Sequence, residues 1–135
     1  MSSAISTTFY VSTIGSDEND CRSLSLPCLT IQCAIDKSTN GDDILIAPGI
    51  YLENIFISKG VFIRSLNFYE PVIIDGSNDN LSTVSINNAQ TQINVEILGI
   101  IITGGEAVGG GIYIPNGNLY LKQTVVTKNS SIGHG

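Results

Sequence analysis

Residues 111–127, with the sequence GIYIPNGNLYLKQTVVT, contain three short apolar segments that are separated by only a few polar or turn-forming residues. The segments are GIYI, NLYL and TVVT, and the separating residues are PNG and KQ. They are rich in β-branched, aromatic and leucine side chains. Short runs of this composition, bounded by turn residues, predict three β-strands joined by sharp corners.

The same group of three strands occurs twice more in the preceding sequence. The first strands start near residues 55, 83 and 111, which is a period of about 28 residues. The second strands are 61–64, 95–98 and 119–122, and the third are 72–75, 100–103 and 124–127. Nine short strands could also form a sandwich, but the repeat favours a solenoid. One coil cannot bury its inward side chains alone, whereas coils stacked at about 4.8 Å bury them as continuous columns.

The repeat assigns each strand residue to an inward or an outward column. The predicted inward columns are Ile63, Ile97 and Leu121; Val72, Ile100 and Thr124; and Ile74, Ile102 and Val126. The predicted outward columns are Phe62, Glu96 and Tyr120; Arg64, Leu98 and Lys122; Ile73, Ile101 and Val125; and Asp75, Thr103 and Thr127. None of these outward columns holds two carboxylates. We expect Gly104, Gly105, Gly109, Gly110 and Gly111 to form a corner with positive φ angles.

A different pattern precedes the repeat. Residues 9–13 predict a strand, and residues 29–37 have helical spacing, with Pro27 before them and Asn40-Gly41 after them. The expected apolar face of this helix comprises Leu29, Ile31, Cys33, Ala34 and Ile35. We expect the helix to cover the open edge of the first coil, with a partner-binding helix as the alternative.

Two stretches then show a specific resemblance to a known superfamily. Residues 41–53, GDDILIAPGIYLE, resemble the opening coil of pectin-lyase-like right-handed parallel β-helices, and the strand and helix before them resemble its N-terminal cap. Residues 109–114, GGGIYI, and the segment 119–129 are similar to the Gly-Gly-x-Ile coils of secreted and surface proteins, including the chlamydial polymorphic outer membrane type. The resemblance implies an all-β fold, a single-stranded right-handed parallel β-helix with a capping strand and α-helix. It leaves the activity open, because this fold hosts lyases, hydrolases, epimerases, adhesins and ice binders.

We therefore divide the chain into an N-terminal cap, residues 1–41, and β-helix coils, residues 42–135. The sequence stops at Gly133-His134-Gly135, where the preceding coil carries Gly109-Gly110-Gly111 and a new strand. We expect a solenoid that continues beyond this point or that associates end to end through an open edge.

Composition excludes several classes of function. The chain is 42% hydrophobic but only 13% charged, and its net charge is −6. Nucleic acids and anionic membranes attract clustered Lys and Arg, so neither is an expected partner. No apolar run approaches the roughly 18 residues of a membrane span, and no signal peptide is visible at the start.

The cysteines and two glycosylation motifs bear on the compartment. Cys21 and Cys28 flank a turn-like segment, and a possible disulfide between them would indicate an oxidising compartment, extracellular or at the cell surface. Three free thiols are the alternative, and the odd count leaves one thiol unpaired in either case. The triplets Asn80-Leu-Ser and Asn129-Ser-Ser match the N-glycosylation motif, although such triplets arise often by chance in sequence rich in Asn and Ser.

No catalytic residues can be assembled from the sequence. His134 lies in a Gly-His-Gly that resembles a polygalacturonase motif, but those enzymes also need an Asn-Thr-Asp, which is absent, and an adjacent Asp-Asp. Asp42-Asp43 lies far upstream, where we expect it to form a turn. Lyases of this fold bind calcium through stacked outward carboxylates. The outward carboxylates here are Asp75 and Glu96, with Glu53 and Glu70 as further candidates, and we expect them to be solvated surface charges because they do not stack in one column. We expect no metal or other cofactor, and calcium only if the protein is a lyase.

Contact surfaces are better candidates than catalytic sites. Phe62 and Tyr120, and Phe56 and Tyr113 on the first strands, are expected to project outward, where aromatic rings can stack on sugars. The expected carbohydrate or partner contacts are Phe62, Glu96, Tyr120, Tyr113, Ile73, Ile101 and Val125. Loops 66–71 and 106–110 packed over these faces are the alternative.

These observations favour a noncatalytic extracellular or surface module that binds carbohydrate or a protein partner. The alternative is the N-terminal fragment of a polysaccharide lyase or glycoside hydrolase whose active site lies on coils absent here.

Overall fold

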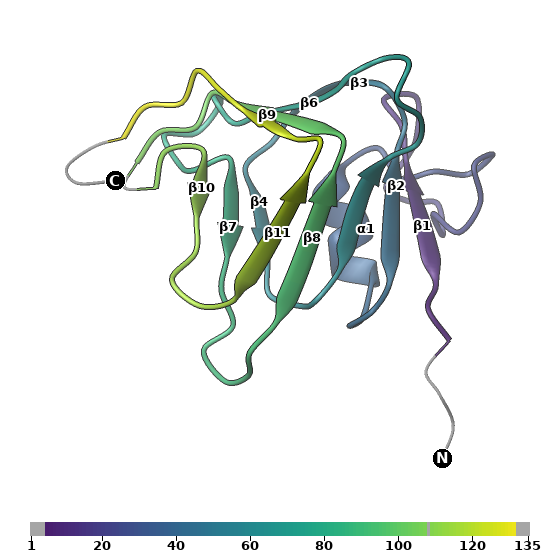
Figure 1. The fold of residues 1–135 in the computed structure, drawn as a ribbon. Coiled ribbons are helices and arrows are strands. Elements are labelled where there is room, and N and C mark those ends of the chain that lie inside the picture. Colours follow the sequence, from purple (N-terminus) through teal and green to yellow (C-terminus); the bar gives the residue numbers. More distant parts are fainter. Residues whose placement is uncertain (1–4, 108, 132–135) are drawn as a thin grey trace.

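The computed structural model describes residues 5–107 and 109–131, and these residues form three parallel β-sheets and one short helix (Figure 1). The five-stranded sheet has the order β1 (Thr8–Val11), β2 (Asp43–Ile46), β5 (Phe62–Ser65), β8 (Asn94–Leu98), β11 (Asn118–Lys122). The four-stranded sheet has the order β12 (Val125–Val126), β9 (Ile100–Thr103), β6 (Val72–Asp75), β3 (Gly49–Leu52). The three-stranded sheet has the order β10 (Ile112–Tyr113), β7 (Val84–Ile86), β4 (Ile55–Ile57). The all-β prediction is confirmed.

The chain visits the three sheets in rotation. We call one visit to each sheet a circuit, so that β2, β3 and β4 form the first circuit and β5, β6 and β7 the second. The third circuit is β8, β9 and β10, and β11 and β12 begin a fourth. Each strand pairs in parallel with the equivalent strand of the next circuit, as Ile63 pairs with Ile97. The predicted column neighbours are confirmed wherever both residues lie in paired strands.

The core lies between the three sheets and consists mainly of isoleucine. Alternate residues of each strand point inward, and the largest fully buried side chains include Ile44, Ile63, Ile97, Ile74 and Ile102. β-Branched side chains suit this arrangement because they pack well on a pleated surface. Leu121 and Val126, on the fourth circuit, continue these columns but are 41% and 44% exposed, because no described strand packs over them.

Strand β3 (Gly49–Leu52) is not among the strands predicted from the sequence. In this strand the aliphatic residues Ile50 and Leu52 point outward, whereas Tyr51 points into the core. The Tyr51 hydroxyl donates a hydrogen bond to the Ala47 carbonyl at 2.6 Å. Asp43, also assigned to a turn, is the first residue of β2.

The helix α1 spans Ile31–Lys37 and packs against β1, β2 and β4. Its buried residues are Ile31, Ala34 and Ile35, and Thr30 is the N-cap. Leu29, which was expected on the apolar face, precedes the cap and is 44% exposed. That expectation was wrong because a side chain before the first helical residue does not follow the helical period.

The glycine corner differs in part from the prediction. Only Gly104 and Gly110 have positive φ angles, of 76° and 60°. Gly105 is required for another reason, since a Cβ there would collide with the carbonyl of Gly110.

Candidate functional site

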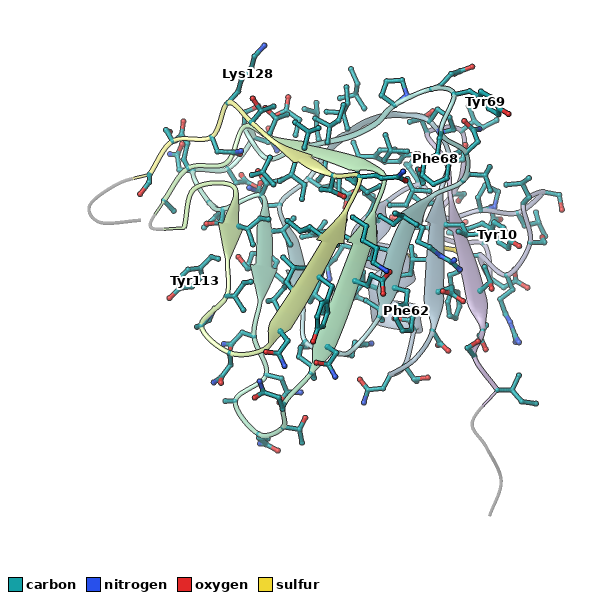
Figure 2. All side chains as sticks on the ribbon, viewed as in Figure 1. Tyr10, Phe62, Phe68, Tyr69, Tyr113 and Lys128 are labelled. Atoms are coloured by element: carbon teal, nitrogen blue, oxygen red, sulfur yellow. A yellow bond between two sulfur atoms is a disulfide. The ribbon has the colours of Figure 1, made fainter. Side chains whose placement is uncertain are left out.

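The expected contact residues lie on three different faces of the molecule. Phe62, Glu96 and Tyr120 share an outward column of the five-stranded sheet, whereas Tyr113 lies on the three-stranded sheet. Ile73, Ile101 and Val125 form a column of the four-stranded sheet. In Figure 2, Tyr113 projects away beside β10 while Phe62 lies over the five-stranded sheet. The structure therefore does not bring these residues into one site.

A groove on the outer face of the three-stranded sheet combines exposed aromatic side chains, a serine and loop walls. Phe56, Ser85 and Tyr113 are neighbours in the strand register, with Ser85 in the middle. The two aromatic side chains are 51% and 43% exposed. Since adjacent strands lie about 4.8 Å apart, the two aromatic residues stand about 10 Å apart, on either side of the serine.

Loops build the walls of this groove. Leu81 and Ser82 come from the connection between β6 and β7, Ala107 and Gly109 precede β10, and Pro115 follows it. The groove has a volume of about 360 Å³, within the range of small-ligand sites. Its lining residues carry no charged side chain.

Several polar groups in the lining have no hydrogen-bond partner in the part of the chain that the structure describes. Among the described residues, neither the Ser85 hydroxyl, the Asn87 side-chain amide nor the Tyr113 hydroxyl makes a hydrogen bond. The Ser82 hydroxyl, by contrast, donates to the Glu106 carbonyl at 3.4 Å. An apolar groove with a few unused donors and acceptors is the usual composition of a site for a small polar ligand.

The backbone around the groove is firmly held. The Gln32 side chain of α1 accepts a hydrogen bond from the Phe56 N–H at 2.8 Å and donates one to the Phe56 carbonyl at 3.0 Å. The Asn54 amide donates to the carbonyls of Gly76, Leu81 and Ser82 at 2.9, 3.2 and 3.2 Å. These contacts hold the edge strand and one loop wall of the groove in place without a ligand.

The two aromatic residues were predicted from the sequence, whereas Ser85 and Asn87 were not. A period of 28 residues counted back from Tyr113 leads to Ser85, whereas the same period counted forward from Phe56 leads to Val84. Asn87 follows that strand directly, and its place in the groove depends on the loop path.

The outer face of the five-stranded sheet carries paired charges. Asp43, Phe62, Glu96 and Tyr120 form one column, so the prediction that no column holds two carboxylates was wrong. Asp43 lies 2.8 Å from the Arg64 guanidinium, and Glu96 lies 3.6 Å from the Lys122 ammonium. Phe62 separates the two carboxylates, and each has its own cation. They therefore do not converge as a calcium site requires.

One outward column of the four-stranded sheet is apolar. Ile50 extends the predicted column of Ile73, Ile101 and Val125. Loop residues 67–71 line shallow hollows beside this column, which is the arrangement that we gave as the alternative to an open contact face. Ile50 and Val125, at the two ends, remain 61% and 52% exposed.

Carboxylates near the N-terminal cap accept hydrogen bonds from backbone N–H groups. Glu53, expected to be a surface carboxylate, is half-buried and accepts hydrogen bonds from the N–H groups of Ile31 and Gln32 at 2.8 and 3.1 Å. Its burial outweighs these hydrogen bonds, so the pKa of Glu53 is raised. Burial would also raise the pKa of Asp17, but hydrogen bonds from Thr30 and Leu29 prevail and the pKa is lowered.

Two further groups near the first circuit have perturbed pKa values. Asp42 is buried and accepts hydrogen bonds from Thr7 and Thr39, and these outweigh its desolvation and lower its pKa. Burial, together with the charge of Glu53, raises the pKa of Tyr51 to about 12. These groups hold the backbone together and lie outside the groove.

The cysteines form a compact cluster. Cys21 and Cys28 are joined by a disulfide, and the free Cys33 lies with its sulfur within 4.8 Å of both. Burial and the nearby charge of Asp17 raise the pKa of the Cys33 thiol. A protonated thiol beside a closed disulfide is a poor set of metal ligands, because metals bind the thiolate.

His134, which lies in the Gly-His-Gly motif, is outside the described residues.

Comparisons with known proteins give one informative match. No family model matches the chain, and no solved structure matches it. A cell surface glycoprotein of Methanothermus fervidus is 38% identical over 88 residues, which is 64% of this chain and 13% of that protein. The chain thus corresponds to a small part of this relative. In the described part of the chain, no helix has the length and hydrophobicity that a transmembrane helix needs.

Proposed function

We propose that this chain is a noncatalytic module of a cell-surface protein that binds a neutral carbohydrate in the groove between Phe56 and Tyr113. The observation that carries the proposal is the row of Phe56, Ser85 and Tyr113, two exposed aromatic residues on either side of a serine with a free hydroxyl. The proposal includes the fold type, a right-handed parallel β-helix of the pectin-lyase-like superfamily.

The strand connectivity supports this fold type. A chain that rotates through three parallel sheets, with equivalent strands stacked in register, has the connectivity of a parallel solenoid. Right-handed connections between parallel strands are the strong general preference. The strand β1 and the helix α1 lie at the first circuit, where the superfamily has its cap.

Two observations support a surface location. The 88-residue match is to a protein named as a cell surface glycoprotein. The Cys21–Cys28 disulfide suits an oxidising environment, because thiols are kept reduced in most cytosols.

The chemistry of the groove supports a sugar as the ligand. The C–H face of a pyranose ring is apolar and packs on an aromatic ring, while its rim carries hydroxyl groups that need hydrogen-bond partners. Ser85, Asn87 and Tyr113 offer such partners without giving up bonds within the protein. A neutral ligand is favoured over an acidic one, because no cation lines the groove and the net charge is −6.

The ion pairs on the five-stranded sheet support a noncatalytic role. Asp43 and Glu96 are the carboxylates closest in register to exposed aromatic rings, and both are neutralised by a neighbouring cation. The enzyme alternative predicts that reducing or unsaturated ends appear when the protein is incubated with polygalacturonate or neutral polysaccharides. The proposed function predicts binding without such products, with and without calcium.

Calorimetric titration with neutral hexasaccharides, built from glucose, mannose or galactose, tests the binding site. Phe56→Ala and Tyr113→Ala are expected to weaken the binding of the preferred sugar about 4- to 12-fold. Each side chain is about half exposed before binding, so the lost contact is worth about 0.8–1.5 kcal/mol, half of the value for a full burial. Tyr120→Ala is the matched control, because Tyr120 is 57% exposed on another face. Equal losses for Tyr113→Ala and Tyr120→Ala, or no binding of any neutral sugar, would contradict the proposal.

A further inference from the structure

The two N-glycosylation triplets differ sharply in their structural setting. Asn80-Leu81-Ser82 and Asn129-Ser130-Ser131 both satisfy the Asn-x-Ser pattern with x other than proline. The sequence pattern alone does not distinguish the two asparagines. They differ in whether the side chain makes hydrogen bonds within the fold.

Asn80 is available for modification. It lies in an exposed turn, residues 77–80, in the connection between β6 and β7. Among the described residues its side-chain amide makes no hydrogen bond. A glycan attached there would extend into solvent without displacing any protein contact.

Asn129 is committed to the fold. Its amide nitrogen donates to the carbonyls of Ile102 and Thr127 at 3.2 and 2.9 Å, and its oxygen accepts from the Gly105 N–H at 2.8 Å. Both amide hydrogens are therefore used. A glycan replaces one of these hydrogens and would occupy the space between the third and fourth circuits.

We propose that Asn80 is an N-glycosylation site and that Asn129 is not. The proposal rests on the proposed surface location, because N-glycans are added to exported chains. The donor would be a lipid-linked oligosaccharide phosphate. The Asn80 Nδ2 forms a bond to the sugar C1, the C1–O bond to the phosphate breaks, the lipid phosphate leaves with the electron pair, and the amide proton passes to a base of the transferase.

The burial of Ser82 constrains when this transfer takes place. The hydroxyl of the third residue is part of the signal, but in the folded chain Ser82 is only 5% exposed and donates to the Glu106 carbonyl. Transfer must therefore precede the packing of residues 104–107 over Ser82. Asn129 is also accessible at that stage, so a chain glycosylated at Asn129 is expected to lose the contacts of that side chain and not to reach the folded state. After folding, the glycan would stand beside Leu81, at the rim of the groove.

Expression of the full chain behind a cleavable export leader, in a host that N-glycosylates, tests the proposal. The experiment reads the modification directly, so it is independent of whether the groove binds sugar. Intact mass and site mapping with peptide N-glycosidase in H₂¹⁸O are expected to show one glycan, at Asn80. Asn80→Gln and Ser82→Ala are expected to remove it and Ser82→Thr to keep it. Asn78→Gln, in the same exposed turn, is the matched control and is expected to leave it in place.

Two results would overturn the proposal. One is an unmodified Asn80 on chains whose Cys21–Cys28 disulfide shows that they were exported. The other is a glycan at Asn129 in folded, secreted protein.

Discussion

Neighbouring isoleucines in β9 give a sharp test of the strand register. Ile102 is 0% exposed in the core, whereas Ile101 points outward and is partly exposed. Ile102→Ala removes three buried carbon atoms, or about 2.4 kcal/mol at about 0.8 kcal/mol each, and the cavity left behind brings the loss within the usual 2–5 kcal/mol. Ile101→Ala is expected to reduce the free energy of unfolding by about 1 kcal/mol or less, because part of that side chain is already in water.

The aspartate versions of the same pair enlarge the contrast. Ile102→Asp would bury a carboxyl group without a partner, and a burial that raises its pKa above 7 alone costs about 4 kcal/mol at pH 7, since the group must then take up a proton. Together with the lost packing this approaches the whole stability of a small domain, so the variant is expected to be unfolded. Ile101→Asp is expected to remain folded. Urea unfolding followed by circular dichroism measures all four variants, and equal losses at the two positions would refute the register.

Two other predictions concern the N-terminal part of the chain. Replacing both Cys21 and Cys28 with serine is expected to lower stability by about 2.5 kcal/mol, from the entropy of the short loop that the disulfide closes, and urea unfolding that matches the wild type would contradict this. The pKa of Asp42 is lowered in the folded state, so its carboxylate contributes stability above the unfolded pKa, and this is lost as the pH falls below about 3.8 through the folded pKa. Asp42→Asn is therefore expected to be less stable than the wild type at pH 7, with a smaller difference at pH 3, and a difference that does not change with pH would refute this linkage.

The fold could be predicted largely from the sequence because a short repeat is its organising element. Strand β8 alternates in polarity, with Asn94 and Glu96 outward and Val95 and Ile97 buried, and the repeat extends this assignment to the equivalent strands. Strand β3 could not be found this way, because Ile50 and Leu52 are apolar on the outward side. Alternation reports burial only where the outward residues are polar.

The groove could be predicted only in part. The register offset from Phe56 to Ser85 is 29 residues (85 − 56) and that from Ser85 to Tyr113 is 28 (113 − 85), so a strict 28-residue period would place Val84 opposite Phe56. Side chains on a strand alternate between faces, so this error of one residue would hide the serine. The walls at Leu81 and Pro115 depend on loop paths that no periodicity encodes.

The ion pair of Asp43 and Arg64 was missed for a related reason. The sequence assigned Asp43 to a turn, whereas it begins β2 and stands beside Phe62 in the register. A strand boundary shifted by one residue decides whether a carboxylate belongs to a loop or to a column, and such boundaries are the least predictable feature of a strand.

The location of the bound sugar is the most direct test of the central claim. Backbone amide shifts of ¹⁵N-labelled protein, recorded during titration with the best-binding neutral hexasaccharide, report which face the ligand contacts. If the sugar binds in the groove, the largest shift changes are expected at Phe56, Ser85, Asn87 and Tyr113. The amides of the five-stranded sheet are then expected to show no change. Shifts concentrated at Phe62, Glu96 and Tyr120 would contradict the claim and place the ligand on the charged face.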